Sequence, residues 1–237
     1  MSAALRSAAT LGPYFTWEPW DGDAAWRPLD DLLDPEVLGE RVEVARRTLM
    51  RMSGLGRDEI GEREVASITF LGLASRLLSP PLGAAVLTGT PVTARLWWRP
   101  VEGGPIPFAY AEAVDAPLTT DLVAPILEAY RRRFTLSTQV LWGNVASALG
   151  GAAGMIADQH RAHTTRAFAL VAELLATPPL EGAADLVRPD PGKERAFLVR
   201  RNCCLYYRIP GGGTCGDCVL TPADVRSRSW QAVLSRH

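Results

Sequence analysis

All four cysteines of the chain lie within one short stretch near its C-terminal end. Cys203 and Cys204 are adjacent, and Cys215 and Cys218 follow with the C-x-x-C spacing of a pair that closes on one metal centre. Four thiols gathered in this way can form disulfides, bind zinc or bind an iron–sulfur cluster. A disulfide between adjacent cysteines is strained, because their Cα atoms lie closer together than a relaxed disulfide prefers. The stretch therefore indicates a metal site.

Two kinds of metal site fit these thiols. Zinc takes four thiolates in a tetrahedron, usually from two C-x(2–4)-C pairs, and Cys215 and Cys218 alone have that spacing. A [2Fe–2S] cluster spreads its four thiolates over two irons, so adjacent cysteines that point in different directions can each find a place. The spacing differs from that of plant-type ferredoxins. Spacing alone favours the cluster slightly, and zinc stays open.

Glycines and arginines surround the cysteines. Residues 211–213 and Gly216 are glycines, which let backbone N–H groups approach sulfur, and such hydrogen bonds raise the potential of a cluster. Arg200, Arg201 and Arg208 can offset the negative charge of four thiolates. A glycine-rich turn with solvated arginines explains the same residues, and a zinc loop is compatible with both features.

This stretch resembles the C-terminal part of the FhuF-like ferric-siderophore reductases. The similar features are the spacing C-C-x10-C-x2-C, Leu-Tyr-Tyr-Arg after the first two cysteines, and Gly-Gly before Cys-Gly-Asp-Cys. Residues 76–80 and 141–144 resemble segments of the family's body, so the resemblance runs from about residue 60 to 220. Val219 follows the last cysteine, where many members have Pro.

The resemblance implies that Cys203, Cys204, Cys215 and Cys218 are the ligands of a [2Fe–2S] cluster. It implies an oxidoreductase that passes one electron to a bound ferric siderophore, so that Fe(II) is released for iron acquisition. The chain has no dinucleotide fingerprint, P-loop or nucleophile elbow, so we expect an external electron donor such as a ferredoxin or a ferredoxin/flavin reductase. The alternatives are an iron–sulfur electron carrier or sensor without a substrate, and a zinc-stabilised binding module.

The candidate substrate-binding residues are arginines and aromatics. The aromatics are equally well explained as core side chains. Within a strand Trp97 and Trp98 point to opposite faces, so we expect one of them in the core. The candidates are Arg201, Arg208, Tyr206, Tyr207, Trp97, Trp98 and Trp142.

Composition sets broad limits on the protein. The chain has 237 residues, 47% of them hydrophobic and 22% charged, which is enough for a sizeable core. The net charge of −1 gives no general attraction to nucleic acid or anionic membranes. We expect no membrane span and, because residues 1–11 lack a signal-peptide core, a cytoplasmic protein.

The predicted fold class is α+β, with a mainly helical body, a small antiparallel sheet and a cysteine-rich C-terminal loop. Strands do not alternate regularly with helices, which argues against a doubly wound sheet. We divide the chain into an irregular, aromatic-rich arm (1–33) that docks on the core or lines a cleft, a helical body (34–192) with a hairpin near 93–113, and a cluster-binding segment (193–237).

Local signals place the elements of this body. Asp34 and Pro35 start a helix to about Met52, and Ser137 starts another. Pro80 and Pro81 are expected to break a helix that covers 58–78. The other expected elements are strands at 93–99 and 107–113, a helix from Thr119 or Thr120 to Phe134, a helix at 156–176, a linker at 177–192, a strand at 196–200 and a helix after Pro222.

Two further clusters have both a structural and a functional explanation. Residues 131–133 are three arginines at a predicted helix C-terminus, where cations complement the helix dipole; an anion-facing patch is the alternative. His160 and His163 are three residues apart, close to Asp158, and share a face of the predicted helix. A metal site there is less well supported than a pair of surface histidines.

Overall fold

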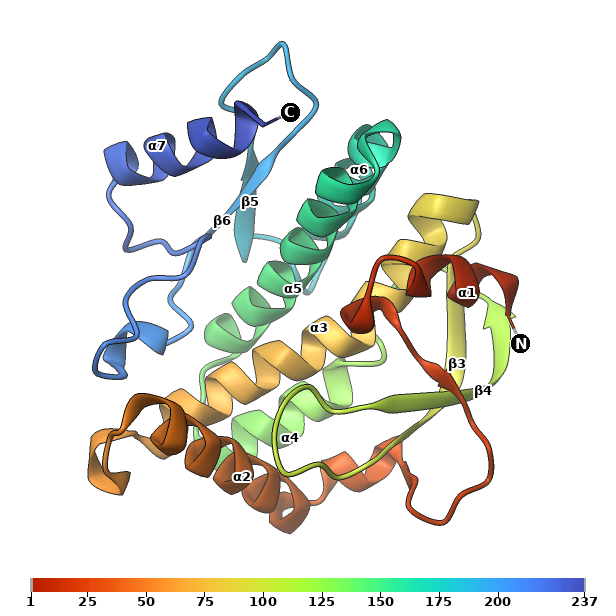
Figure 1. Cartoon of the computed structure of the whole chain (residues 1–237), viewed down its shortest axis with the longest axis vertical. Coiled ribbons are helices and arrows are strands. Elements are labelled where there is room, and N and C mark those ends of the chain that lie inside the picture. Colours follow the sequence, from red (N-terminus) through yellow and green to blue (C-terminus); the bar gives the residue numbers. More distant parts are fainter. Residues whose placement is uncertain (1, 237) are drawn as a thin grey trace.

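Two long apolar helices form the centre of the molecule (Figure 1). The structure is a computed structural model that describes residues 2–236. Helix α3 (Glu62–Thr88) packs along α5 (Thr138–Gln159), and most residues of both are buried. Neither helix has a strongly polar face, which is the pattern of a helix buried on several sides. The remaining elements cover this pair.

Helix α3 continues through Pro80 and Pro81, so the predicted break is wrong. A proline at position 80 leaves the carbonyl of Arg76, four residues earlier, without its helical hydrogen bond. The indole Nε1–H of Trp17 donates to this carbonyl at 3.0 Å. Both prolines are buried in the core. The packing around α3 therefore satisfies the group that the proline leaves unpaired.

The N-terminal segment is more regular than predicted. It forms a helix, α1 (Ala3–Ala9), which packs on α3, and two short strands, β1 (Glu18–Pro19) and β2 (Arg27–Pro28). Phe15, Trp17 and Trp26 are buried, so part of the segment belongs to the core.

The predicted hairpin is confirmed as β3 (Val92–Trp98) and β4 (Phe108–Asp115). The sheet is not purely antiparallel, because β1 pairs with β4 in parallel while β2 pairs with β3 antiparallel. Its order is β1-β4-β3-β2.

The other helices lie close to their predicted positions. Helix α2 (Pro35–Ser53) is capped by Asp34, and α5 is capped by Ser137. The helix predicted at 156–176 is divided, because α5 continues to Gln159 and a 3₁₀ turn precedes α6. Helix α4 (Ala124–Phe134) begins after Val123, so the predicted cap at Thr119 or Thr120 is wrong, although the helix ends at Phe134 as predicted. The remaining bounds are α6 (Thr164–Leu175) and α7 (Ala223–Leu234).

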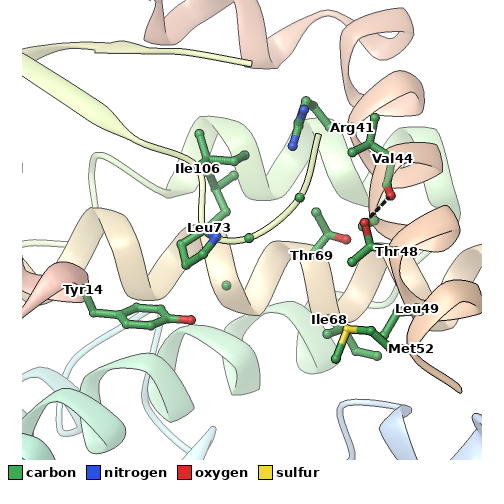
Figure 2. Close-up of a pocket in the computed structure, with 15 residues that line it drawn as sticks. Tyr14, Arg41, Val44, Thr48, Leu49, Met52, Ile68, Thr69, Leu73 and Ile106 are labelled. Carbon is green, nitrogen blue, oxygen red and sulfur yellow. Dashed lines mark hydrogen bonds between the residues drawn. The ribbon is translucent and has the colours of Figure 1, made fainter. Parts of the chain in front are cut away.

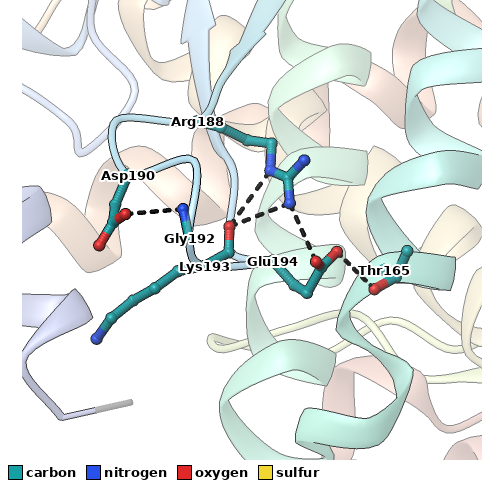
Figure 3. A network of polar contacts seen from close by, with 6 residues as sticks. All are labelled: Thr165, Arg188, Asp190, Gly192, Lys193 and Glu194. Carbon is teal, nitrogen blue, oxygen red and sulfur yellow. Dashed lines mark hydrogen bonds and ion pairs between the residues drawn. The ribbon is translucent and has the colours of Figure 1, made fainter.

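A second, two-stranded sheet carries the cysteine segment. Strand β5 (Ala184–Val187) lies within the predicted linker and pairs with β6 (Phe197–Arg200), close to the predicted strand. The loop between them is held on α6, since Glu194 accepts a hydrogen bond from Thr165 at 2.7 Å and pairs with Arg188 at 3.2 Å (Figure 3). In Figure 1 this C-terminal unit (blue) and the β3–β4 hairpin lie on opposite sides of α5.

Helices α3 and α5 are each long and apolar enough to span a membrane, which the sequence analysis did not anticipate. Their most apolar windows are 78% and 72% buried inside the fold. The protein itself thus covers these surfaces, as in the core helices of soluble proteins.

Candidate metal centre

The four cysteines lie between β6 and α7, around a 3₁₀ turn at Tyr206–Arg208. Cys204 and Cys218 are 2% and 1% exposed, while Cys203 and Cys215 are partly exposed. The sulfurs of Cys204 and Cys215 are 3.9 Å apart. Two thiolates that share one tetrahedral metal at about 2.3 Å lie about 3.8 Å apart. This pair therefore already has the spacing of two ligands on one metal ion.

Backbone N–H groups point at the sulfurs of Cys203, Cys204 and Cys218. The N–H of Leu205 donates to Cys203 at 3.3 Å, and that of Leu220 donates to Cys218 at 3.4 Å. Leu205 has φ +70°, a left-handed conformation that is unfavourable for leucine. N–H···S hydrogen bonds stabilise the negative charge of a thiolate and raise the potential of a bound cluster.

The contact between Cys204 and Cys215 changes the acidity of both thiols. When Cys215 donates its S–H to Cys204, this hydrogen bond lowers the pKa of Cys204 and raises that of Cys215. Desolvation raises the pKa of the Cys203 thiol, and the N–H of Leu205 opposes that effect. The contact therefore favours a thiolate on one sulfur of the pair, which is the form that binds metal.

The body fixes the Cys215–Cys218 turn through Asp217. The Asp217 carbonyl accepts from the backbone N–H of Arg200 at 3.0 Å, and its carboxylate accepts from the Ser147 hydroxyl of α5. Gly212 lies against Tyr206, where a Cβ would come within 2.7 Å of the Tyr206 carbonyl oxygen. The loop can therefore fold back closely only with glycine at this position.

The donor set and its surroundings fit an anionic metal centre. Arg200 is 1% exposed, and its Nε and Nη1 have no hydrogen-bond partner among residues 2–236. A buried cation without an anionic partner is unfavourable. Four thiolates bound to metal would supply negative charge close to Arg200, since Cys203 is only three residues further along the chain.

The predicted arginines and tyrosines border the cysteines. Arg201 pairs with Asp185 through two hydrogen bonds of 2.7 and 2.9 Å, and its side chain is 58% exposed. Arg208 lies 3.5 Å from Glu64 of α3. Tyr206 packs against the core, whereas Tyr207 is 45% exposed.

The predicted tryptophans lie within the body. Trp97 and Trp98 are both buried, on opposite faces of β3. Trp97 stacks on Trp20 with 4.4 Å between ring centroids, and Trp98 lies in the main core. Trp142 is half-buried on α5 and packs against the same core.

Two cavities of more than 400 Å³ lie among residues 2–236. One of about 440 Å³ lies beside the cysteine turn and is lined by Gly216, Asp217, Phe197, Trp230 and three glycines of α5, namely Gly150, Gly151 and Gly154. The other, of about 410 Å³, lies between α2, α3 and the β3–β4 loop; its walls are mainly apolar, with Arg41 at one side (Figure 2). Tyr14 of the N-terminal segment lines the second cavity, as one of the two explanations of that segment predicts, whereas the other lining residues of both cavities were not predicted.

The other candidate clusters have structural partners. Arg131 and Arg132 pair with Glu128, and Arg133 pairs with Glu62, which favours the structural explanation of the arginine run. His160 and His163 lie at the ends of a 3₁₀ turn, and not on one helix face, with ring centroids 6.4 Å apart. Within residues 2–236 no three His, Cys, Asp or Glu side chains, the four cysteines included, are close enough to hold a single metal ion, so the ligand spacing noted above is that of the Cys204–Cys215 pair.

Residues 200–220 match the family model of the FhuF 2Fe-2S C-terminal domain. The resemblance of this segment is confirmed. The matched residues contain all four cysteines and extend from the end of β6 to the residues just before α7. A search of curated proteins found no match for the chain.

Sequence reasoning missed the residues of α5 that hold the cysteine segment. Residues 141–144 resemble a segment of the family's body, but nothing in their sequence indicates a contact with the cysteines. Gly143 lies against Arg200 and Asn202, where a Cβ would come within 2.9 Å of the Arg200 Nη2 atom and 2.2 Å of the Asn202 Oδ1 atom. A glycine inside a long apolar helix is the one available signal, because it is unfavourable there without a packing reason.

Proposed function

We propose that this protein is a ferric-siderophore reductase, in which Cys203, Cys204, Cys215 and Cys218 hold a [2Fe–2S] cluster near the surface. The observation that carries the proposal is that all four thiols lie within the segment that matches a 2Fe-2S domain. When bound, such a cluster supplies single-electron transfer. One electron converts the Fe(III) of the chelate to Fe(II), which hard oxygen donors hold more weakly.

The residues around the cysteines have distinct roles in this proposal. Cys204 and Cys218 are buried, so they anchor the centre in the protein. Cys203 and Cys215 are partly exposed, so they face the side from which electrons enter or leave. Tyr207, beside them and exposed, is a candidate contact for the chelate or the electron donor.

The cavity beside the cysteine turn is the better candidate site for the chelate. Gly216 and Asp217 lie between two of the proposed ligands and also line this cavity. Electron transfer slows steeply with distance, so an acceptor held against these residues is well placed. The predicted contacts Trp97 and Trp98 are buried in the sheet and line neither of the two cavities, which weakens their candidacy.

Stopped-flow mixing tests the function. Protein reduced with dithionite and freed of excess reductant is mixed with several ferric chelates. We expect cluster reoxidation and trapped Fe(II) to match one for one, and the rate to saturate with the correct siderophore. Equal, unsaturable rates with every chelate would favour the electron-carrier alternative. NADPH alone should not reduce the protein.

A pair of variants sharpens this experiment. Tyr207→Ala should weaken saturation by a chelate that extends beyond the cavity, because it removes an exposed ring that lies beside the cysteines and outside the cavity lining. Trp20→Phe is the control, because this exposed ring lies on the sheet and stacks on Trp97. If both variants behave like the unchanged protein, Tyr207 is not part of the chelate site.

The proposed setting is the cytoplasm, with an external protein as electron donor. A reducing compartment keeps four thiols available for metal. A zinc-stabilised module remains the alternative for the same thiols, since the 3.9 Å spacing of Cys204 and Cys215 fits zinc as well as iron.

A further inference from the structure

We propose that Arg200 raises the reduction potential of the metal centre by keeping a positive charge buried beside the cysteines, and that Gly143 of α5 makes room for it. The proposal rests on the binding of an iron–sulfur cluster by the four cysteines. It is independent of the identity of the electron acceptor.

Among residues 2–236, no carboxylate lies within ion-pair distance of the Arg200 guanidinium. Its Nη2 donates to the Val140 carbonyl at 3.3 Å and to Asn202 Oδ1 at 3.2 Å, and both acceptors are neutral. Nε and Nη1 have no hydrogen-bond partner in the part of the chain that the structure describes. The side chain is 1% exposed, so water screens this charge poorly. An anionic centre nearby would compensate for this unpaired charge.

Gly143 provides the space for this arrangement. A Cβ at this position would come within 2.9 Å of the Arg200 Nη2 atom and within 2.2 Å of the Asn202 Oδ1 atom. Glycine in a helix interior is less favourable than alanine by about 0.5–1 kcal/mol. Gly143 lies where the segment before Cys203 contacts α5, and a larger residue there would collide with Arg200 and Asn202.

The neighbouring Arg201 is in a different environment. Its side chain is 58% exposed and makes a two-fold ion pair with Asp185. Its charge is therefore both neutralised and screened by water. The two adjacent arginines form a natural pair of test and control.

Electrostatics gives the direction of the effect. Reduction adds one negative charge to the centre, so a buried positive charge stabilises the reduced form more than the oxidised form. The carboxylate of Asp217, between Cys215 and Cys218, acts in the opposite direction. Removing the charge of Arg200 should lower the potential, and removing that of Asp217 should raise it.

The experiment is protein-film voltammetry on the full-length protein, with iron and sulfide measured in every sample. The variants are Arg200→Gln, Arg200→Lys, Asp217→Asn and the control Arg201→Gln. Arg200→Gln should shift the equilibrium constant for reduction at least tenfold toward the oxidised form, which corresponds to about 59 mV for one electron. Asp217→Asn should shift it the other way. Arg200→Lys, which keeps the charge, and Arg201→Gln should each shift it less than about threefold, or about 28 mV.

Each outcome decides the proposal. An unchanged potential in fully loaded Arg200→Gln contradicts it. If Arg200→Gln does not hold the cluster, Arg200→Lys decides: loading with a near-normal potential supports a role for charge. Loss of the cluster in the lysine variant as well would mean that Arg200 acts through the geometry of its hydrogen bonds, and the proposal would be wrong. Gly143→Ala should lower cluster content or change the electron paramagnetic resonance line shape, because it displaces Arg200.

Discussion

The α3–α5 core and the cysteine segment at 200–220 are held in place by different means. In the core, buried apolar side chains from elements far apart in sequence fix the geometry, as the contact between Phe70 and Tyr130 illustrates. The cysteine segment has few apolar side chains, several glycines and a left-handed Leu205. Packing therefore determines the body, whereas the shape of the cysteine segment depends on a few polar contacts and, we infer, on its metal. This difference makes the two regions separable by experiment.

The largest expected effect is loss of the cluster from the cysteine segment alone. Each of Cys203, Cys204, Cys215 and Cys218 changed to Ser should lose most of the visible absorption, because serine is a poorer and harder ligand for iron. Far-ultraviolet circular dichroism should stay close to that of the unchanged protein, since α7 is the one α-helix that follows the cysteines within residues 2–236. The control is Val219→Ala, an exposed position between Cys218 and Leu220. A Ser variant with an unchanged spectrum identifies a cysteine that is not a ligand.

Removal of the metal should affect the same segment. Metal binding orders its ligands, so the apoprotein should exchange amide hydrogens faster at 200–220 than the loaded protein. Helices α3 and α5 should keep their protection. Equal loss of protection in both regions would mean that the body, too, depends on the metal.

A change in the core should lower the stability of the protein and leave the reduction potential of the metal centre nearly unchanged. Phe70→Ala removes a fully buried ring and should lower the free energy of unfolding by about 3–5 kcal/mol. The reduction potential should change little, because Phe70 lies in the core and not at the cysteines. Denaturant unfolding and voltammetry on the same sample measure both quantities. A large shift of the potential would show that the two regions are coupled.

A smaller loss of unfolding free energy is expected when the hydrogen bond at the two prolines of α3 is removed. Trp17→Phe removes the donor to the Arg76 carbonyl and should cost about 1–3 kcal/mol of unfolding free energy. Trp20→Phe, at an exposed ring, should cost about 0.5 kcal/mol or less. Equal losses in the two variants would mean that the hydrogen bond from Trp17 does not stabilise the helix.

The smallest effect on the free energy of unfolding is expected from a change at Arg201, the exposed arginine beside the cysteines. Arg201→Gln breaks the ion pair with Asp185, but the free energy of unfolding should change only slightly, because water screens this exposed pair. The sequence analysis treated Arg200, Arg201 and Arg208 alike as sources of positive charge. A large loss of stability in Arg201→Gln would contradict the distinction made here between buried and exposed arginines.

Features with a local cause could be predicted from the sequence. The four cysteines form one cluster by spacing, Ser137 caps its helix because its side chain reaches the Val140 N–H, and the hairpin follows from strand composition. Features with a distant cause could not be predicted. The continuity of α3 depends on Trp17, which lies 59 residues before Arg76. Strands of two residues, such as β1, are too short to show a periodic pattern.

The same limit applies to the candidate site. Arg200 and Arg201 are adjacent and chemically identical, so sequence alone does not show which is buried. Their difference arises from Gly143 and Asn202 on one side and from Asp185 on the other. Of the large cavities, the one beside the cysteines is assembled from α5, β6 and α7 and has no sequence signature.

Metal and sulfide analysis of freshly purified protein, together with its visible spectrum, tests the central claim most directly. The account predicts a reddish-brown protein with about two irons and two acid-labile sulfides per chain. On reduction it should show the electron paramagnetic resonance signal of a [2Fe–2S] cluster. A colourless protein from iron-replete cells, with stoichiometric zinc and no sulfide, would contradict the account and favour the zinc-stabilised module.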